Sequence, residues 1–309
     1  MKISVANITF SKNKLLREEL NCYFSNVIYN EKFQRMNHEE LTIFCNNSEV
    51  LILGLEKFNE SLFIENPNLK IIAKFGVGID NIDFELLKKY KITLLHEIGV
   101  NKDEVAEFAY CQILSLLRNT SFTSNMLKRG LWVKDGGYSL EESTIGIIGV
   151  GNIGKTVLEK ILKEECKQIY CYDIDKRKTE FFQNIENVSI CNLDVLCAKS
   201  DLITIHIPGD KINDSFLCND LVNKMKKGVK LLNISRGSIV NYEDILLNIS
   251  NGNIHSFCTD VFPHEPFFDS RFVNNDRILC TPHIAGNSAQ SVYKMGKSVI
   301  NSLKYFYNK

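Results

Sequence analysis

Short runs of β-branched and aliphatic residues recur along the chain, and longer stretches of mixed polarity separate them. Runs of this length, bounded by polar or turn-forming residues, are typical of buried strands. We expect strands at residues 3–6, 50–53, 71–74, 92–95, 144–150, 169–172, 202–207, 230–234 and 256–260. Because these strands alternate with helix-length segments, the pattern predicts βαβ units and an α/β protein with parallel sheets.

Two stretches have helical spacing instead. From Asp103 towards Arg118, apolar residues recur every three or four positions, as on the buried face of a helix. These residues are Val105, Ala106, Ala109, Ile113, Leu116 and Leu117. The same spacing returns over residues 289–307, where a second long helix could return to pack on the first domain.

The length of 309 residues predicts two domains, because a single hydrophobic core stops growing well below that size. We place the hinge near residues 97–101. Hydrophobic residues make up 44% of the chain and charged residues 24%, so the chain has the composition of a folded globular protein. Basic and acidic residues number 37 each, so no excess charge draws the molecule to nucleic acid or to an anionic membrane.

Ten cysteines are scattered along the chain, with no Cys-x-x-Cys pair and no alternation of Cys and His. Reduced thiols are expected, and no metal site is predicted. The first ten residues lack the basic start and long apolar core of a signal peptide, and no apolar stretch approaches the length of a membrane span. These features predict a cytoplasmic location.

A glycine-rich segment follows one of the predicted strands. Residues 144–155 read Thr-Ile-Gly-Ile-Ile-Gly-Val-Gly-Asn-Ile-Gly-Lys, which places Gly149, Gly151 and Gly154 between the strand and a helix. Gly149 permits a tight turn, Gly151 lets the backbone approach a pyrophosphate, and Gly154 lets helix and strand pack closely. The alternative is a tight turn in some other α/β protein.

The next predicted strand ends in Asp173, nineteen residues past Gly154. A carboxylate at this position accepts both ribose hydroxyls of NAD and repels the 2′-phosphate of NADP, so the pair of features predicts a Rossmann domain that binds NAD. A solvated strand-end residue is the alternative for Asp173. Lys176 and Arg177 lie close behind it and leave NADP open, although NAD is favoured.

Three residues suited to hydride transfer follow predicted strands farther along the chain: Arg236, Glu265 and His283. Imidazole titrates near neutral pH, so His283 can take the hydroxyl proton as hydride leaves the carbon. Glu265 would hold the ring and favour its protonated form, and Arg236 can bind a substrate carboxylate. Each residue taken alone would be an ordinary loop residue; their order and setting together favour a catalytic site.

With these motifs the chain resembles the D-isomer-specific 2-hydroxyacid dehydrogenase family, from about residue 71 to residue 286. Residues 231–240, Leu-Leu-Asn-Ile-Ser-Arg-Gly-Ser-Ile-Val, resemble its arginine motif. Residues 258–266, Cys-Thr-Asp-Val-Phe-Pro-His-Glu-Pro, resemble its glutamate motif, and residues 280–286, Cys-Thr-Pro-His-Ile-Ala-Gly, resemble its histidine motif.

The resemblance implies two doubly wound parallel-sheet domains. A Rossmann NAD-binding domain, 99–286, would be inserted in a flavodoxin-like substrate (catalytic) domain, 1–98 plus 287–309. It implies that Asp260 contacts the nicotinamide carboxamide and that His206 and Pro208 line the adenosine side, although composition alone would make His206 a core or strand-end histidine. The implied cofactor contacts are Gly149, Gly151, Asn152, Ile153, Gly154, Asp173, His206, Pro208, Ile234, Ser235, Asp260, His283 and Gly286.

The resemblance also implies the binding of the substrate. In the first domain, residues 74–83 are similar to the family's substrate loop, where the backbone N–H groups of Val77 and Gly78 would bind the substrate carboxylate. A glycine-rich turn built for packing is the alternative. Asn101 and Arg236 complete the expected substrate contacts, and the family implies a homodimer.

The exact substrate stays open at this point. The loop at 75–83 is similar to the phosphoglycerate dehydrogenase branch, while hydroxypyruvate or glyoxylate reduction fits the same motifs. Residues 209–213 depart from the family pattern, which leaves contacts on the adenosine side open. Formate-oxidising relatives lack the glutamate matched by Glu265, and phosphite-oxidising relatives have lysine in place of Val77, so both chemistries are disfavoured. An NAD-sensing corepressor of the same fold is the alternative outside enzymes.

Overall fold

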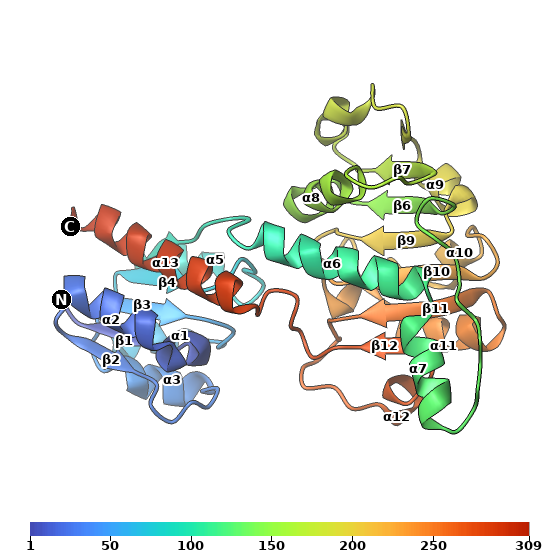
Figure 1. Cartoon of the computed structure of the whole chain (residues 1–309). Helices are drawn as coiled ribbons and strands as arrows, with labels where there is room; N and C mark the ends of the chain where they lie inside the picture. The colour runs from blue at the N-terminus through green and yellow to red at the C-terminus, as the bar shows by residue number, and fades with distance from the viewer. Residues whose placement is uncertain (309) are drawn as a thin grey trace. The chain divides into compact units, whose positions relative to one another are not determined.

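A computed structural model describes residues 1–308 of the chain. Contacts divide the chain into two compact units. The smaller unit comprises Met1–Asn101 together with the chain from Asn287 onward, and the larger unit comprises Lys102–Gly286. Each unit is built around one parallel sheet with helices on both faces (Figure 1). The predicted α/β class is confirmed.

The smaller unit has a five-stranded parallel sheet in the flavodoxin-like order β2-β1-β3-β4-β5. Its strands are β1 Ile3–Val5, β2 Val27–Tyr29, β3 Val50–Leu53, β4 Ile71–Lys74 and β5 Thr93–Leu95. Its helices are α1 Ile8–Lys12, α2 Lys14–Tyr23, α3 His38–Cys45, α4 Ser61–Glu65, α5 Phe84–Tyr90 and α13 Ala289–Phe306.

Helix α13 completes the core of the smaller unit although it comes from the end of the chain. Val299, Ile300 and Leu303 lie in one apolar cluster with Leu16 and Leu20 of α2. A side chain at Gly296 would overlap the side chain of Leu16, so glycine allows the two helices to approach closely. This face of the sheet is therefore covered by the two ends of the chain together.

The larger unit has a seven-stranded parallel sheet in the order β12-β11-β10-β9-β6-β7-β8. The strand order reverses between β6 and β9, which is the switch point where doubly wound sheets bind their ligands. Its strands are β6 Thr144–Ile148, β7 Gln168–Tyr172, β8 Val188–Ile190, β9 Leu202–Ile205, β10 Val229–Asn233, β11 Ile254–Thr259 and β12 Ile278–Cys280.

Alternate residues of these strands enter two separate cores. Ile147 and Leu232 face α6 and α8, whereas Ile148 and Leu231 face the opposite layer. The helices are α6 Lys102–Leu117, α7 Thr120–Lys128, α8 Asn152–Ile161, α9 Leu193–Lys199, α10 Asn219–Val222, α11 Tyr242–Ser250 and α12 Ser270–Val273, with short 3₁₀ turns η1 Lys176–Lys178, η2 Glu180–Phe182 and η3 Gly237–Ile239. The long helix predicted from Asp103 is α6.

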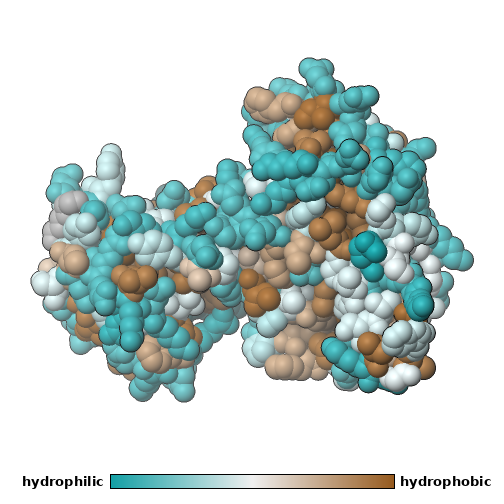
Figure 2. Space-filling model, in the orientation of Figure 1, coloured by the Kyte–Doolittle hydropathy of each residue, from teal (hydrophilic) through white to brown (hydrophobic). Residues whose placement is uncertain are grey.

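The predicted strand ends at 150 and 207 are wrong by two residues each. Strand β6 ends at Ile148 because Gly149 has a φ of 88° and turns the chain, and β9 ends at Ile205. Strands β2, β8 and β12, of three residues each, were not predicted, whereas the equally short β1 and β5 were. Hydrophilic residues cover much of the visible face of each unit, with apolar areas scattered among them (Figure 2).

Candidate active site

The glycine-rich turn after β6 leaves open space in front of α8. A Cβ atom at Gly149 would lie 2.6 Å from the carbonyl oxygen of His206, and one at Gly154 would overlap the carbonyl of Gly149. At Gly151 such an atom would meet nothing within 4 Å. Gly151 is the N-cap of α8 and has no side chain to accept the helix N–H groups, so this helix end can receive a phosphate.

Asp173 follows β7 directly and holds the glycine-rich turn. Its carboxylate accepts the N–H of Val150 at 2.8 Å and the N–H of Asp175 at 2.9 Å, and Lys178 Nζ lies 3.6 Å away. The side chain is only 6% exposed, so the solvated alternative is wrong. A carboxylate has about four acceptor sites, which leaves capacity for ribose hydroxyls. Arg177, which left NADP open, pairs with Asp175 at 2.8 and 2.9 Å.

His206 and Pro208 follow β9, next to the turn. His206 Nε2 lies 2.9 Å from Thr204 Oγ1, while its buried Nδ1 has no partner within residues 1–308. Burial lowers the pKa of His206 to about 3, so the ring is neutral at physiological pH. His206 therefore presents an uncharged imidazole at this edge of the sheet.

The loop after β10 carries Ser235 and Arg236, and a buried asparagine shapes it. Asn233 accepts the N–H of Ser235 at 3.0 Å and donates to the carbonyl of Arg236 at 2.9 Å. Ser235 Oγ donates to the carbonyl of Ile205 at 2.6 Å, which ties the loop to β9. Arg236 Nη1 donates to the carbonyl of Ser235 at 2.8 Å. Ile234, which starts this loop, is buried.

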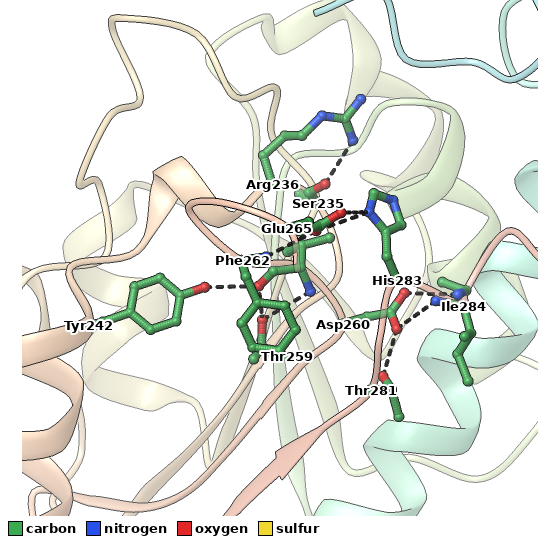
Figure 3. A network of polar contacts seen from close by, with 12 residues as sticks. Ser235, Arg236, Tyr242, Thr259, Asp260, Phe262, Glu265, Thr281, His283 and Ile284 are labelled. Carbon is green, nitrogen blue, oxygen red and sulfur yellow. Dashed lines mark hydrogen bonds and ion pairs between the residues drawn. The ribbon is translucent and has the colours of Figure 1, made fainter. Parts of the chain in front are cut away.

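Glu265 and His283 come from different loops and form an ion pair (Figure 3). The Nδ1 atom of His283 lies 2.8 Å from Oε2 and 3.1 Å from Oε1 of Glu265. The hydrogen bond to Glu265 raises the pKa of His283, whereas burial and Arg236 lower it. The imidazole is 41% exposed, so it can reach a bound molecule.

Asp260 fixes the loop that carries His283. It is fully buried, and it accepts Thr281 Oγ1 at 2.6 Å, the N–H of Ile284 at 2.8 Å and the N–H of Ala285 at 2.8 Å (Figure 3). His283 has a φ of 56°, a left-handed conformation that is rare outside glycine. The contacts of Asp260 hold the loop in this conformation.

The structure brings the predicted residues of the larger unit to one edge of its sheet, because the carboxyl ends of parallel strands share an edge. Val77 and Gly78 lie at the corresponding edge of the smaller unit, where His96 Nε2 is 3.0 Å from the carbonyl of Val77. Asn101 is buried, and its Nδ2 lies 3.8 Å from Met295 Sδ of α13. The substrate contacts assigned to these three residues stay predictions.

Sequence reasoning missed the residues that support the site, among them Asn233, Thr281 and Tyr242. Asn233 and Thr281 stood inside recognised motifs without an assigned role. Tyr242 donates from its hydroxyl to the carbonyl of Val261 at 2.8 Å, a contact across nineteen positions. A contact with a distant backbone atom leaves no pattern in the sequence.

The larger unit has a glycine-rich turn at the switch point of its sheet, a carboxylate at the end of the next strand, as in ribose-binding sites, and a His–Glu pair at the same edge. This combination defines a class of protein, the dinucleotide-dependent oxidoreductases. Residues 110–285 match the family model described as D-isomer specific 2-hydroxyacid dehydrogenase, NAD binding domain. The chain belongs to the D-isomer-specific 2-hydroxyacid dehydrogenase family. It is an NAD-dependent dehydrogenase of that family, whose members act on small hydroxy and keto acids.

Named relatives cover nearly the whole chain. The hydroxypyruvate reductase of Thermotoga maritima is 30% identical over 87% of this chain and 88% of its own length. The glyoxylate reductase of Thermofilum pendens is 30% identical over 90% and 84%. The NAD complex of the formate dehydrogenase of Staphylococcus aureus has a TM-score of 0.83 at 25% identity, over 100% of this chain and 96% of that one.

Within residues 1–308, no helix is long and apolar enough to cross a membrane. The same residues contain no group of three or more His, Cys, Asp and Glu side chains that could hold a metal ion.

Proposed function

We propose that the protein interconverts a small D-2-hydroxy acid and its 2-keto acid, with His283 as general acid and base. The pairing of His283 Nδ1 with Glu265 carries this proposal. Since Nδ1 faces the carboxylate, Nε2 is the nitrogen that exchanges a proton with the substrate oxygen. Glu265 keeps the ring in that orientation and stabilises the imidazolium form.

Arg236 is proposed to bind the substrate carboxylate and polarise the carbonyl. Asn233 holds the loop by a hydrogen bond to the carbonyl of Arg236, and a Cβ atom added at Gly209 would lie 2.5 Å from Cβ and Cγ of Arg236. This close packing restricts the stem of the arginine. A planar guanidinium with a restricted stem can orient a carboxylate through two parallel hydrogen bonds.

The residues at the switch point fit NAD. The open space at Gly151, the uncapped end of α8 and the remaining acceptor capacity of Asp173 suit a pyrophosphate and a ribose. Bound NAD supplies the hydride acceptor or donor. We propose that the turn Gly149–Gly154, with Asn152 and Ile153, holds the pyrophosphate. His206, Pro208, Ile234, Ser235, Asp260 and Gly286 would line the remaining cofactor site.

Hydroxypyruvate and glyoxylate are the proposed substrates. Two relatives that are 30% identical to this chain are named for these acids, a hydroxypyruvate reductase and a glyoxylate reductase. The D-3-phosphoglycerate dehydrogenase of Bacillus subtilis is 27% identical, and the match spans 49% of its length. Phosphohydroxypyruvate therefore belongs in the same test as the competing substrate.

The test measures NADH oxidation with hydroxypyruvate, glyoxylate, phosphohydroxypyruvate and pyruvate, and repeats each with NADPH. We expect rapid turnover of hydroxypyruvate or glyoxylate with NADH, and a loss of at least a hundredfold in kcat for His283→Asn, as is usual for a general acid or base. Undiminished turnover of His283→Asn would contradict the role of the histidine. NADH binding without turnover of any acid would contradict the substrate class.

A homodimer in the cytoplasm is the proposed state of the protein. The segment after α7 exposes large apolar side chains, including Leu131 at 53%, Trp132 at 77% and Tyr138 at 66%. Contiguous exposed apolar groups are typical of interaction sites. Light scattering should report a dimer for the wild type and a monomer for Trp132→Asp; a monomeric wild type would contradict the proposal.

A further inference from the structure

The peptide group that joins Val261 to Phe262 is bonded at both ends (Figure 3). Its carbonyl accepts the hydroxyl of Tyr242 at 2.8 Å and that of Thr259 at 2.8 Å. Its N–H donates to Oε1 of Glu265 at 3.2 Å. Because a peptide group is planar and rigid, a contact on its oxygen fixes the direction of its N–H.

We propose that Tyr242 is a positioning residue for the acid–base pair, acting through the Val261–Phe262 peptide to hold Glu265 against His283. Tyr242 contacts neither the carboxylate nor the imidazole by a hydrogen bond; its hydroxyl orients the amide that donates to Glu265. This inference rests on the proposed roles of Glu265 and His283.

The ring of Tyr242 is fixed by aromatic packing. It lies at the start of α11, with ring centroids 4.8 Å from Phe272 and 5.6 Å from Phe267. Phe267 in turn stacks on Phe262 at 4.8 Å and 12°. The loop 262–267 that carries Glu265 is therefore packed on the same cluster that aims the tyrosine hydroxyl.

The donor stays protonated while the imidazole titrates. Burial raises the pKa of Tyr242 above its usual value, so the phenol keeps its proton throughout the range in which His283 changes charge. The charged groups that act on His283 are Glu265 and Asp260, which favour the imidazolium, and Arg236, which opposes it. Among these three charged groups, Glu265 is the one whose position Tyr242 controls.

The test removes one oxygen atom with Tyr242→Phe and follows the His283 imidazole by NMR. Its signal is identified among the six histidines by its absence from His283→Asn. With Glu265 less firmly placed, we expect the pKa of His283 to fall and kcat to drop about two- to tenfold, the usual effect of one hydrogen bond, with KM nearly unchanged.

The matched control is Tyr29→Phe in the smaller unit. That hydroxyl donates to Asn21 Oδ1 at 2.9 Å and Tyr29 is buried, so the same atom is lost in the unit that carries neither Glu265 nor His283. We expect the titration of His283 and kcat to stay at wild-type values. A matching fall of the His283 pKa in both variants would overturn the proposal, because it would indicate a general loss of stability.

A double-mutant cycle distinguishes an effect of Tyr242 that acts through Glu265 from a general loss of stability. If Tyr242 acts through Glu265, Tyr242→Phe should lower kcat no further in a Glu265→Gln background. An additive loss, or an unchanged pKa of His283 in the single variant, would overturn the positioning role. A failure of the proposed function would give a different result. His283→Asn would then retain full turnover, whereas Tyr242→Phe would still lower the pKa of His283.

Discussion

At the scale of single residues, the charge of Glu265 sets the pH range in which His283 can donate a proton. Reduction of a keto acid requires the imidazolium form, so its rate falls as pH rises through the pKa of His283. Glu265 raises that pKa. In Glu265→Gln the fall in rate should therefore move to lower pH, which a pH profile of kcat/KM would detect; a profile identical to wild type would contradict it.

Asp173 offers a second test at this scale, because its carboxylate serves both the turn and the proposed ribose contact. Asp173→Asn keeps an acceptor for the N–H of Val150 but loses the charge. We expect it to reduce the preference for NADH over NADPH by about tenfold, since hydrogen bonds to charged groups contribute about 1.5–3 kcal/mol. Fluorescence titration with both cofactors measures this preference, and equal selectivity in variant and wild type would refute the ribose role.

Residue types and spacing predicted Gly149, Asp173, Glu265 and His283, since each motif lies within a short segment of chain. The same reasoning could not predict that Asp173 would bind the N–H of Val150, or that Asp260 would hold the histidine loop. Those contacts depend on how strands distant in sequence are registered in the sheet.

At the scale of elements, the 3₁₀ turn η3 packs directly on the loop that carries Glu265. A Cβ atom at Gly237 would overlap the carbonyl group of Phe262. Gly237→Ala should lower the free energy of unfolding by about 1–3 kcal/mol, as overpacking does, and should reduce kcat as the loop shifts. Urea unfolding and steady-state kinetics measure the two effects.

Gly136 provides the control for that substitution. A Cβ atom there would meet nothing within 4 Å. Gly136→Ala should leave kcat unchanged and should not lower stability, since it only restricts the unfolded chain. Equal losses in both variants would mean that contact with Phe262 has no special effect.

Most strands could be predicted because each lies in a mainly apolar run of at least four residues that is bounded by polar or turn-forming residues. Strands β2, β8 and β12 were missed, since three residues give no measurable period; the equally short β1 and β5 were predicted from four-residue segments, 3–6 and 92–95, that extend one residue beyond each strand. The end of β6 was placed too late because the apolar run continues through Val150, beyond the turn at Gly149. Apolar character there serves the packing of the turn rather than the strand.

At the scale of the whole molecule, the two units should respond differently to cofactor. The residues proposed to hold NAD all belong to the larger unit, Lys102–Gly286. A ligand at a hundred times its Kd stabilises the structure that binds it by about 2.7 kcal/mol. Hydrogen exchange with NADH should therefore slow most around 149–154 and 173–175; unchanged exchange in these segments would contradict the assignment.

The order in which the chain is made differs from the order in which its cores can close. The larger unit is complete at Gly286, whereas the smaller unit needs α13, which comes after it. At ordinary rates of synthesis on the ribosome, roughly ten to forty seconds separate Asn101 from the residues of α13. Throughout that interval the apolar face of α2 lacks the side chains of α13 that cover it, so the segment made first is the last whose core can be completed.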